Sequence, residues 1–198
     1  MDEICAKSKP RDRILDTATE LFRRHGIRGI GVDAIAEAAG TNKMTLYRHF
    51  GSKDELIAEC LRHQAEKFDR KWTAIEAAGD ARAQLSAWIR LAGDYLEREK
   101  RGCDLANTAV ELHEDDDHPA RAVIEAFKIA QRDRLAVVCR AAGADDAELL
   151  ADTLYLMLEG ARVSRQSIGP EGPCSRFVKA AEAAVRSAIG EPRQVAAT

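Results

Sequence analysis

Hydrophobic residues in the first half of the chain recur at the spacing of an α-helix. No proline interrupts residues 11–118, and apolar positions there follow the i, i+3, i+4, i+7 pattern of helices with one buried face. His25-Gly26 ends the first such segment, because glycine readily adopts the left-handed conformation that closes a helix. The buried stripe of this predicted helix consists of Ile14, Leu15, Ala18, Leu21 and Phe22.

Two short helices are predicted next. The first covers about Asp33–Ala39, the chain turns at Gly40, and the second covers Lys43–Phe50 with Asn42 as its N-cap. A short helix, a glycine turn and a second short helix form the layout of a helix-turn-helix, whose second helix enters the DNA major groove.

The rest of the chain is also expected to be helical. Ser52 and Glu55 form a capping-box pattern that begins a long helix, which fades near Gly79. No segment alternates with the period of a β-strand, so the fold class is all-α. The later amphipathic segments cover about Ala81–Lys100, Asp104–His113, Pro119–Ala142, Asp145–Ser167 and Ser175–Ile189.

The second short helix has one anchoring face and one chemically active face. Leu46 and Phe50 lie four residues apart and would hold it on the core. An ordinary helical hairpin with a polar outer face is the alternative interpretation of this spacing. The opposite face carries side chains suited to phosphates, guanine edges and thymine methyl groups: Lys43, Met44, Thr45, Tyr47, Arg48 and His49.

The literal sequence here is more specific than its spacing. Over about residues 11–60 the chain resembles the tetracycline-repressor (TetR) family of one-component regulators. Beyond that region it is similar to the family in length and helix content. The strings that carry the resemblance are Ile35-Ala36-Glu37-Ala38-Ala39-Gly40 and Thr45-Leu46-Tyr47-Arg48-His49-Phe50-Gly51-Ser52-Lys53-Asp54-Glu55-Leu56.

The resemblance implies an architecture and a set of DNA contacts. A three-helix helix-turn-helix head would occupy residues 1–55, and an antiparallel helical bundle for ligand binding and dimerisation would occupy residues 56–198. The six residues of the active face would meet a double-stranded operator, and Lys53 would bind a phosphate. Two departures from the family pattern are Gly31, where a capping hydroxyl is usual, and Met44, where a small residue is usual.

A small-molecule effector is expected inside the bundle. Aromatic residues at helical spacing and polar residues within apolar stretches would line its pocket, although plain core packing explains each of them as well. Glu159 and Arg162 are close enough to pair, and Asn107 and Glu111 share one helical face. The candidate effector-binding residues are Trp88, Tyr95, Asn107, Glu111, Phe127, Tyr155 and Arg162.

The resemblance also implies a homodimer in which the last two long helices pair with those of a second copy. Their apolar stripes exceed what one small core needs, and a two-fold four-helix bundle would use the surplus. The stripes comprise Leu149, Leu150, Leu154, Met157, Leu158 and Ala161 on one helix and Phe177, Val178, Ala181, Val185 and Ile189 on the other.

Charge separates the predicted head from the body. Residues 1–53 carry ten Lys and Arg against seven Asp and Glu, whereas the whole chain carries 30 against 33. A basic head on an acidic body is consistent with nucleic-acid contact by the head. The five cysteines form no CxxC pair, which favours reduced thiols in the cytoplasm, and no apolar run is long enough for a membrane span.

Metal binding, redox sensing and catalysis are the competing hypotheses. His113 and His118 flank an acidic run, but their separation of five places them off a common helical face, so we expect a solvated loop and no metal. Cys103 at a helix start is the best candidate for a redox sensor. No catalytic motif or phosphate-binding loop is present, so neither an enzyme nor a cofactor is expected.

The sequence therefore predicts a cytoplasmic, ligand-responsive transcriptional regulator. A repressor that binds a palindromic operator as a dimer and is released by its effector is the expected form. An activator is the alternative within this class, and a helical ligand-binding or oligomerisation module without operator binding is the alternative outside it. The sequence names neither the effector nor the operator.

Overall fold

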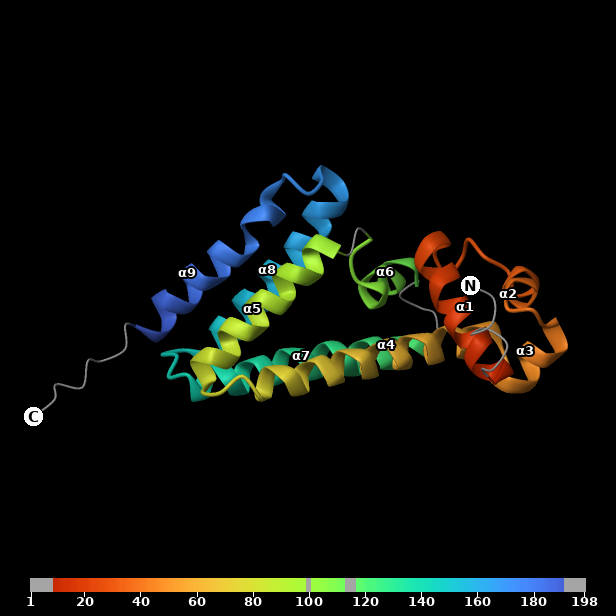
Figure 1. Ribbon diagram of the computed structural model, residues 1–198, viewed down its shortest axis with the longest axis horizontal. Coiled ribbons are helices and arrows are strands. Elements are labelled where there is room, and N and C mark those ends of the chain that lie inside the picture. Colours follow the sequence, from red (N-terminus) through yellow and green to blue (C-terminus); the bar gives the residue numbers. More distant parts are fainter. Residues whose placement is uncertain (1–8, 99–100, 113–116, 191–198) are drawn as a thin grey trace, which may run out of the picture. The chain divides into compact units, whose positions relative to one another are not determined.

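The structure is a computed structural model that describes residues 9–98, 101–112 and 117–190. Within these ranges the chain is helical and contains no strand, so the predicted all-α class is confirmed (Figure 1). The order of elements is α1 Pro10–His25, α2 Val32–Ala38, α3 Lys43–Phe50, α4 Lys53–Glu76, α5 Ala81–Arg98, α6 Asp104–Glu111, α7 Ala120–Ala141, α8 Ala147–Ile168, the 3-10 helix η2 Pro173–Arg176 and α9 Phe177–Ile189.

Most helix boundaries follow the sequence signals. The Asn42 side chain accepts a hydrogen bond from the Thr45 N–H at 2.9 Å, and Ser52 Oγ accepts one from the Glu55 N–H at 3.0 Å. The last helix was expected from Ser175, but a 3-10 turn occupies this stretch and α9 begins at Phe177. Proline at the first position of η2 suits a helical turn, because its fixed φ costs nothing there. The predicted ends at Lys100 and His113 lie outside the described residues.

The chain divides into two compact units. Unit 1 comprises residues 1–69 and 103–127, and unit 2 comprises residues 70–102 and 128–198. Unit 1 thus contains α1 to α3, much of α4, α6 and the start of α7. The functional boundary expected at residue 55 stays a prediction. The centre of the unit 1 core includes Ile14, Ala18, Ile35, Leu46 and Leu56.

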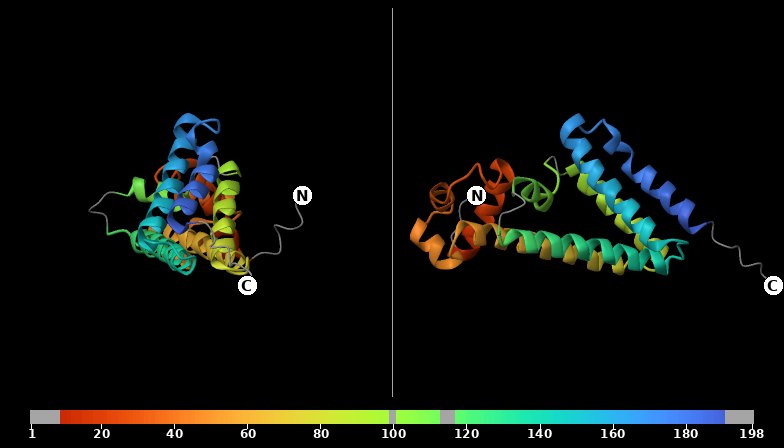
Figure 2. Two further views of the ribbon diagram at one scale, coloured as in Figure 1. Left: turned by 90° about the vertical axis from the view of Figure 1, so that its left-hand side faces the viewer. Right: turned by 180° about the vertical axis from the view of Figure 1, so that it is seen from behind.

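In unit 2, α9 packs against both α5 and α8 (Figures 1 and 2). The Trp88 ring on α5 meets the Phe177 ring of α9 edge-on, with the centroids 6.3 Å apart. Gly93 allows close approach of the same two helices, because a Cβ at this position would lie 2.6 Å from Val178 Cγ2. The core of unit 2 therefore depends on interlocking between α5, α8 and α9.

The outer face of α8 carries apolar side chains. Leu149, Leu156 and Val163 recur every seven residues and are 63%, 68% and 64% exposed. By contrast, much of the apolar stripe expected at a dimer contact lies inside unit 2, because α5 and α9 cover it. The buried residues of that expected set are Leu150, Leu154, Leu158, Ala161, Phe177 and Ala181. Across the described ranges, the helices are too short or too polar to span a membrane.

Candidate nucleic-acid interface and effector site

Helix α3 is held to the unit 1 core by two side chains. Leu46 is fully buried and Phe50 is 8% exposed, and both belong to the cluster that includes Ile14 and Ile35. Gly51 adopts a φ of 76° immediately after α3, so the chain can turn directly into α4. This anchoring fixes which face of α3 remains outside.

The face opposite the anchors is open to solvent. Met44 is 82% exposed and Tyr47 is 39% exposed. Lys43, Arg48 and His49 are also exposed, whereas Thr45 is half-buried. Lys53 is half-buried at the first position of α4. The structure therefore gathers the predicted DNA-facing residues on and directly after one short helix.

An ion pair joins this face to α2. Lys43 Nζ lies 3.2 Å from Asp33 Oδ2, and both side chains are largely exposed. The sequence did not predict that Asp33 belongs to this surface, because ten positions and the turn between α2 and α3 separate it from Lys43. An exposed pair of this kind is weak, so the Lys43 ammonium remains exchangeable with another anion.

Arg11 ties the start of α1 to α3 and α4. Its guanidinium pairs with Glu59 of α4, and its Cζ lies 5.4 Å from the centre of the Phe50 ring. Hydrogen bonds from Arg62 and Arg11 outweigh the effect of burial and lower the pKa of Glu59. Arg11 thereby connects Phe50, which anchors α3, to helix α4.

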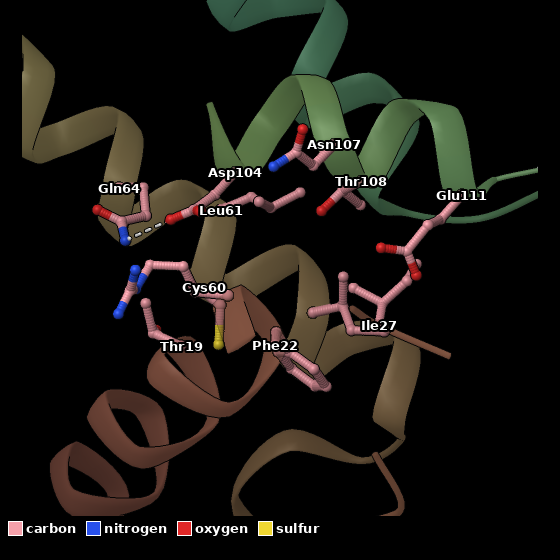
Figure 3. A pocket seen from close by; sticks show the side chains of 12 residues that line it. Thr19, Phe22, Ile27, Cys60, Leu61, Gln64, Asp104, Asn107, Thr108 and Glu111 are labelled. Atoms are coloured by element: carbon pink, nitrogen blue, oxygen red, sulfur yellow. Dashed lines mark hydrogen bonds between the residues drawn. The ribbon is translucent and has the colours of Figure 1, made fainter. Parts of the chain in front are cut away.

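A small cavity lies within unit 1 where α6 meets α1 and α4 (Figure 3). Its volume of about 30 Å³ is enough for one or two water molecules. Gln64 of α4 donates a hydrogen bond to Asp104 of α6 at 3.2 Å across one edge. The floor is apolar and the α6 side is polar, with Phe22, Ile27, Ile57, Leu61, Asn107, Thr108 and Glu111 among the lining residues.

Glu111 also reaches beyond the cavity to the turn after α1. Its Oε2 accepts a hydrogen bond from the Arg28 N–H at 3.2 Å. Gly26 makes room for this carboxylate, because a Cβ there would lie 2.7 Å from Glu111 Oε1. Asn107 and Glu111, which sequence spacing placed on one face of a helix, thus both face the helix-turn-helix side of unit 1.

A polar cluster links α7 and α8 within unit 2. Lys128 Nζ donates to Glu159 Oε1 at 2.7 Å, and Arg162 Nη1 donates to the same oxygen at 2.5 Å. The Arg162 guanidinium also lies over the Tyr95 ring of α5, with Cζ 5.2 Å from its centre. The Glu159–Arg162 pair expected from their spacing is therefore present, and Lys128 joins it.

Aromatic rings border this cluster. Lys128 Nζ lies 5.6 Å from the centre of the Tyr155 ring, and burial raises the pKa of the Tyr155 hydroxyl. Lys71 Nζ of α4 lies 5.7 Å from the centre of the Tyr95 ring. The Tyr95 hydroxyl donates to the Gly102 carbonyl at 2.7 Å, which fixes the ring. Lys71 and Lys128 extend the candidate site beyond the residues chosen from sequence.

The seven predicted effector residues fall into separate groups. Tyr95, Tyr155 and Arg162 belong to the polar cluster of unit 2. Trp88 belongs to the packing with Phe177 described above. Asn107 and Glu111 line the cavity of unit 1, and the Phe127 ring packs on Phe68 of α4 with centroids 5.4 Å apart. Their roles in effector binding stay predictions.

A larger hollow of about 330 Å³ lies in unit 2 at the C-terminal end of α8, between α5, η2 and α9. Arg165 lines it and donates from Nη2 to the Glu97 carbonyl at 2.9 Å. The remaining described lining residues are Gly93, Leu96, Glu97, Pro170, Glu171, Cys174, Ser175, Phe177 and Val178.

The described cysteines are buried free thiols. Cys103, the candidate redox sensor, is 2% exposed, so solvent does not reach it in this conformation. Burial raises the pKa of Cys60 to about 12 and that of Cys139 to about 11, which keeps both thiols protonated.

His118 has a structural role at the start of α7. Its Nδ1 accepts a hydrogen bond from the Ala120 N–H at 3.0 Å. His113, the other half of the expected loop, lies outside the described residues. No group of potential metal ligands forms among the residues that the structure describes.

Comparison with known proteins identifies the family. Residues 14–60 match the family model of bacterial regulatory proteins, tetR family. The transcriptional repressor KstR2 of Rhodococcus jostii is 34% identical over 116 residues, which cover 58% of this chain and 53% of KstR2. The match thus spans about half the length of that relative.

Two further comparisons cover more of the chain. The transcriptional regulator BetI of Rhizobium meliloti is 30% identical over 162 residues, which cover 80% of this chain and 78% of BetI. The crystal structure of SCO4454, a TetR-family regulator from Streptomyces coelicolor, superimposes with a TM-score of 0.84 at 28% identity, covering 91% of this chain and 96% of that one. These relatives are regulators of transcription and not enzymes, as expected from the sequence. The chain belongs to the TetR family of transcriptional regulators.

Proposed function

We propose that this protein is a transcriptional repressor that binds a palindromic operator as a homodimer and releases it when a small molecule binds. The exposed face of α3, held on buried Leu46 and Phe50, is the observation that carries this proposal. A short helix anchored on one side and polar on the other is the element that helix-turn-helix proteins insert into the major groove.

The DNA contacts divide into two kinds. Lys43, Tyr47 and Lys53 contact phosphates and position the head, because ammonium and phenol groups donate to phosphate oxygens. Arg48 reads guanine, while His49 and Thr45 contact neighbouring base edges. Met44, which is 82% exposed, reads a thymine methyl group by apolar contact.

The dimer forms through α8 and α9. Leu149, Leu156 and Val163 provide an exposed apolar row on α8, which suits a helix that packs against a copy of itself. Two recognition helices related by a two-fold axis then match the two halves of a palindrome.

Effector binding shifts the population between two dimer geometries. The effector binds in unit 2 at the cluster of Tyr95, Tyr155 and Arg162, with Trp88 contributing apolar surface. In unit 1, Asn107 and Glu111 on α6 are further effector-binding residues of this proposal, and Glu111 holds the turn after α1 through the hydrogen bond that it accepts from the Arg28 N–H. The protein acts in the cytoplasm, where its operator is accessible, and repression is the activity named for KstR2.

Fluorescence anisotropy with the DNA upstream of the gene itself tests operator binding. We expect saturable binding of the full chain that survives competitor DNA. The bound DNA should contain two half-sites about one helical turn apart, one for each recognition helix of the dimer. Arg140→Ala, on the exposed end of α7, serves as a control of unchanged affinity. Binding that competitor DNA abolishes would leave the chain as a helical ligand-binding or oligomerisation module.

A further inference from the structure

A ligand-sized hollow in unit 2 brings charged and apolar side chains together. Its volume is about 330 Å³, and it lies between α5, the C-terminal end of α8, η2 and α9. One water molecule needs roughly 10–15 Å³ of such space, so the hollow is far larger than a packing defect between helices. Small-molecule sites in proteins begin at about this size and combine apolar walls with a few polar groups.

The apolar wall of the hollow comes from α5 and α9. Leu96 and Phe177 line it with buried side chains, and Val178 lines it with a half-buried one. The Phe177 ring is held by its edge-on contact with Trp88. This wall is therefore preformed and suits the apolar part of a ligand.

Arg165 is the cation of the hollow. It lies half-buried in the last turn of α8, and its Nη2 donates to the Glu97 main-chain carbonyl at 2.9 Å. That carbonyl carries no net charge, and no carboxylate within the described ranges pairs with the guanidinium. Nε is buried without an acceptor there, and Nη1 has no described partner either. A guanidinium has five N–H donors, so Arg165 retains donors for a carboxylate ligand.

Two carboxylates border the same hollow. Glu97 and Glu171 both line it, and both side chains are exposed. Across the described residues neither of them forms an ion pair, and Arg165 bonds to the backbone of Glu97 instead of its side chain. Opposite charges thus line one hollow without pairing with each other.

This arrangement selects a ligand by its charges. A carboxylic acid without an amine would bring a further negative charge beside Glu97 and Glu171. An amine without a carboxylate would leave Arg165 without an anionic partner. A molecule that carries both groups forms charge-assisted hydrogen bonds with both kinds of side chain. The ligand that suits the hollow is therefore a zwitterion with an apolar side chain.

We propose that this hollow is a second small-molecule site of unit 2, which binds an apolar amino acid or a dipeptide of such residues. The ligand carboxylate binds Arg165, and its ammonium group lies beside Glu171 and Glu97. Its apolar side chain packs on Leu96 and Phe177. The site goes beyond the proposed function, since it includes neither the DNA-facing residues nor the cluster around Tyr95.

Isothermal titration calorimetry on the full chain without DNA tests the charge requirement. The probes are L-leucine and L-leucyl-L-leucine, each compared with its N-acetyl form, which lacks the ammonium group, and its amide, which lacks the carboxylate. We expect the better-binding zwitterion to exceed both of its capped forms by at least about tenfold, as loss of one charge-assisted hydrogen bond predicts. The ratio between the two zwitterions shows whether a free amino acid or a dipeptide fills the hollow.

Substitutions locate the binding. Arg165→Gln should reduce the affinity for the zwitterion about tenfold and leave the weaker affinity for its amide unchanged, because the amide has no carboxylate to lose. Glu171→Gln should weaken the zwitterion and the amide about two- to fivefold but not the N-acetyl form, since this carboxylate is exposed. Arg165→Lys should retain part of the affinity and keeps the test valid if Arg165→Gln does not fold. Arg186→Gln, which removes a 68% exposed arginine from α9, is the control and should change no affinity.

Three results would overturn the inference. One is the failure of both zwitterions to bind at concentrations up to about 10 mM. The second is a capped form that binds as tightly as its zwitterion, which would indicate a site for a plain acid or a plain amine. The third is zwitterion binding that Arg165→Gln leaves unchanged, which would place the ligand elsewhere. Operator DNA has no part in these titrations, so their outcome is independent of the proposed function.

Discussion

The carboxylate of Glu111 near the end of α6 accepts a hydrogen bond from the Arg28 N–H, although 83 positions separate the two residues. Arg28 lies in the turn between α1 and α2, the first two helices of the helix-turn-helix region. Because the donor is the backbone N–H of residue 28, the hydrogen bond constrains the path of that turn and does not depend on the side chain at this position. Helix α6 is thereby joined to the part of unit 1 that carries α3.

Gly26→Ala should destabilise unit 1. Gly26 adopts φ 76° and ψ 165°, a conformation that costs other residues about 1–3 kcal/mol. The new methyl group would also collide with the Glu111 carboxylate. Urea unfolding should show the loss, and the double variant with Glu111→Ala should relieve the collision but not the backbone cost. A Gly26→Ala protein as stable as the wild type would contradict this account.

Lys53→Ala and Tyr47→Ala should weaken binding to every DNA sequence to a similar extent. Both side chains are proposed to contact phosphates, which carry no sequence information. For Lys53→Ala the slope of log affinity against log salt should decrease by about one, since one ionic contact is lost. Anisotropy titrations at several salt concentrations measure this. An unchanged slope would show that Lys53 makes no phosphate contact.

Asp33→Asn should strengthen DNA binding by about two- to fivefold at low salt, on the scale of a surface ion pair. The change removes a carboxylate next to the proposed interface and releases Lys43 from its 3.2 Å contact. The gain should shrink in a Lys43→Ala background, and it should fade as salt screens the charges. A weaker complex after Asp33→Asn would argue against contact between Lys43 and DNA.

Leu156→Glu should convert the proposed dimer to a monomer while the helical content stays the same. The side chain is 68% exposed, so unit 2 loses no core contact, but a carboxylate in the centre of the α8 row would be buried at the interface. Sedimentation equilibrium measures the mass. Val137→Glu, at a 59% exposed position of α7, is the matched control and should remain dimeric. Equal masses for wild type and Leu156→Glu would place the contact elsewhere.

Cys60 should resist alkylation in the native protein. Burial raises its pKa to about 12, so the neutral thiol persists and only about one molecule in 10⁴ carries the reactive thiolate at about pH 8. Iodoacetamide followed by mass spectrometry should label Cys60 only after unfolding. Labelling of the native protein at the rate of a free thiol would instead require an open conformation of the α1–α4 contact.

The sequence predicted elements well because the relevant signals are local. Asn42 and Ser52 cap the helices for which they were chosen, since a cap depends on atoms within three residues. The helix-turn-helix was identifiable because its anchors and its exposed face lie within one short helix. The family model that confirms the resemblance matches this same region, residues 14–60.

Relationships between distant helices could not be obtained in that way. Lys128 and Glu159 are 31 positions apart, and no local pattern pairs them. On α8, apolar residues occur on more than one side, so spacing alone did not show that Leu154 is buried while Leu156 is exposed. That difference depends on where α5 and α9 pack, which is a property of the whole unit.

The attachment of α3 through Leu46 and Phe50 has an evolutionary consequence. Substitutions at the exposed positions of this helix alter the reading surface while leaving the packed interior intact, and exposed substitutions typically change stability by less than about 0.5 kcal/mol. Operator preference can therefore drift or be redesigned without a compensating change elsewhere. A duplicated copy of this gene could acquire a new set of target promoters through a handful of codon changes.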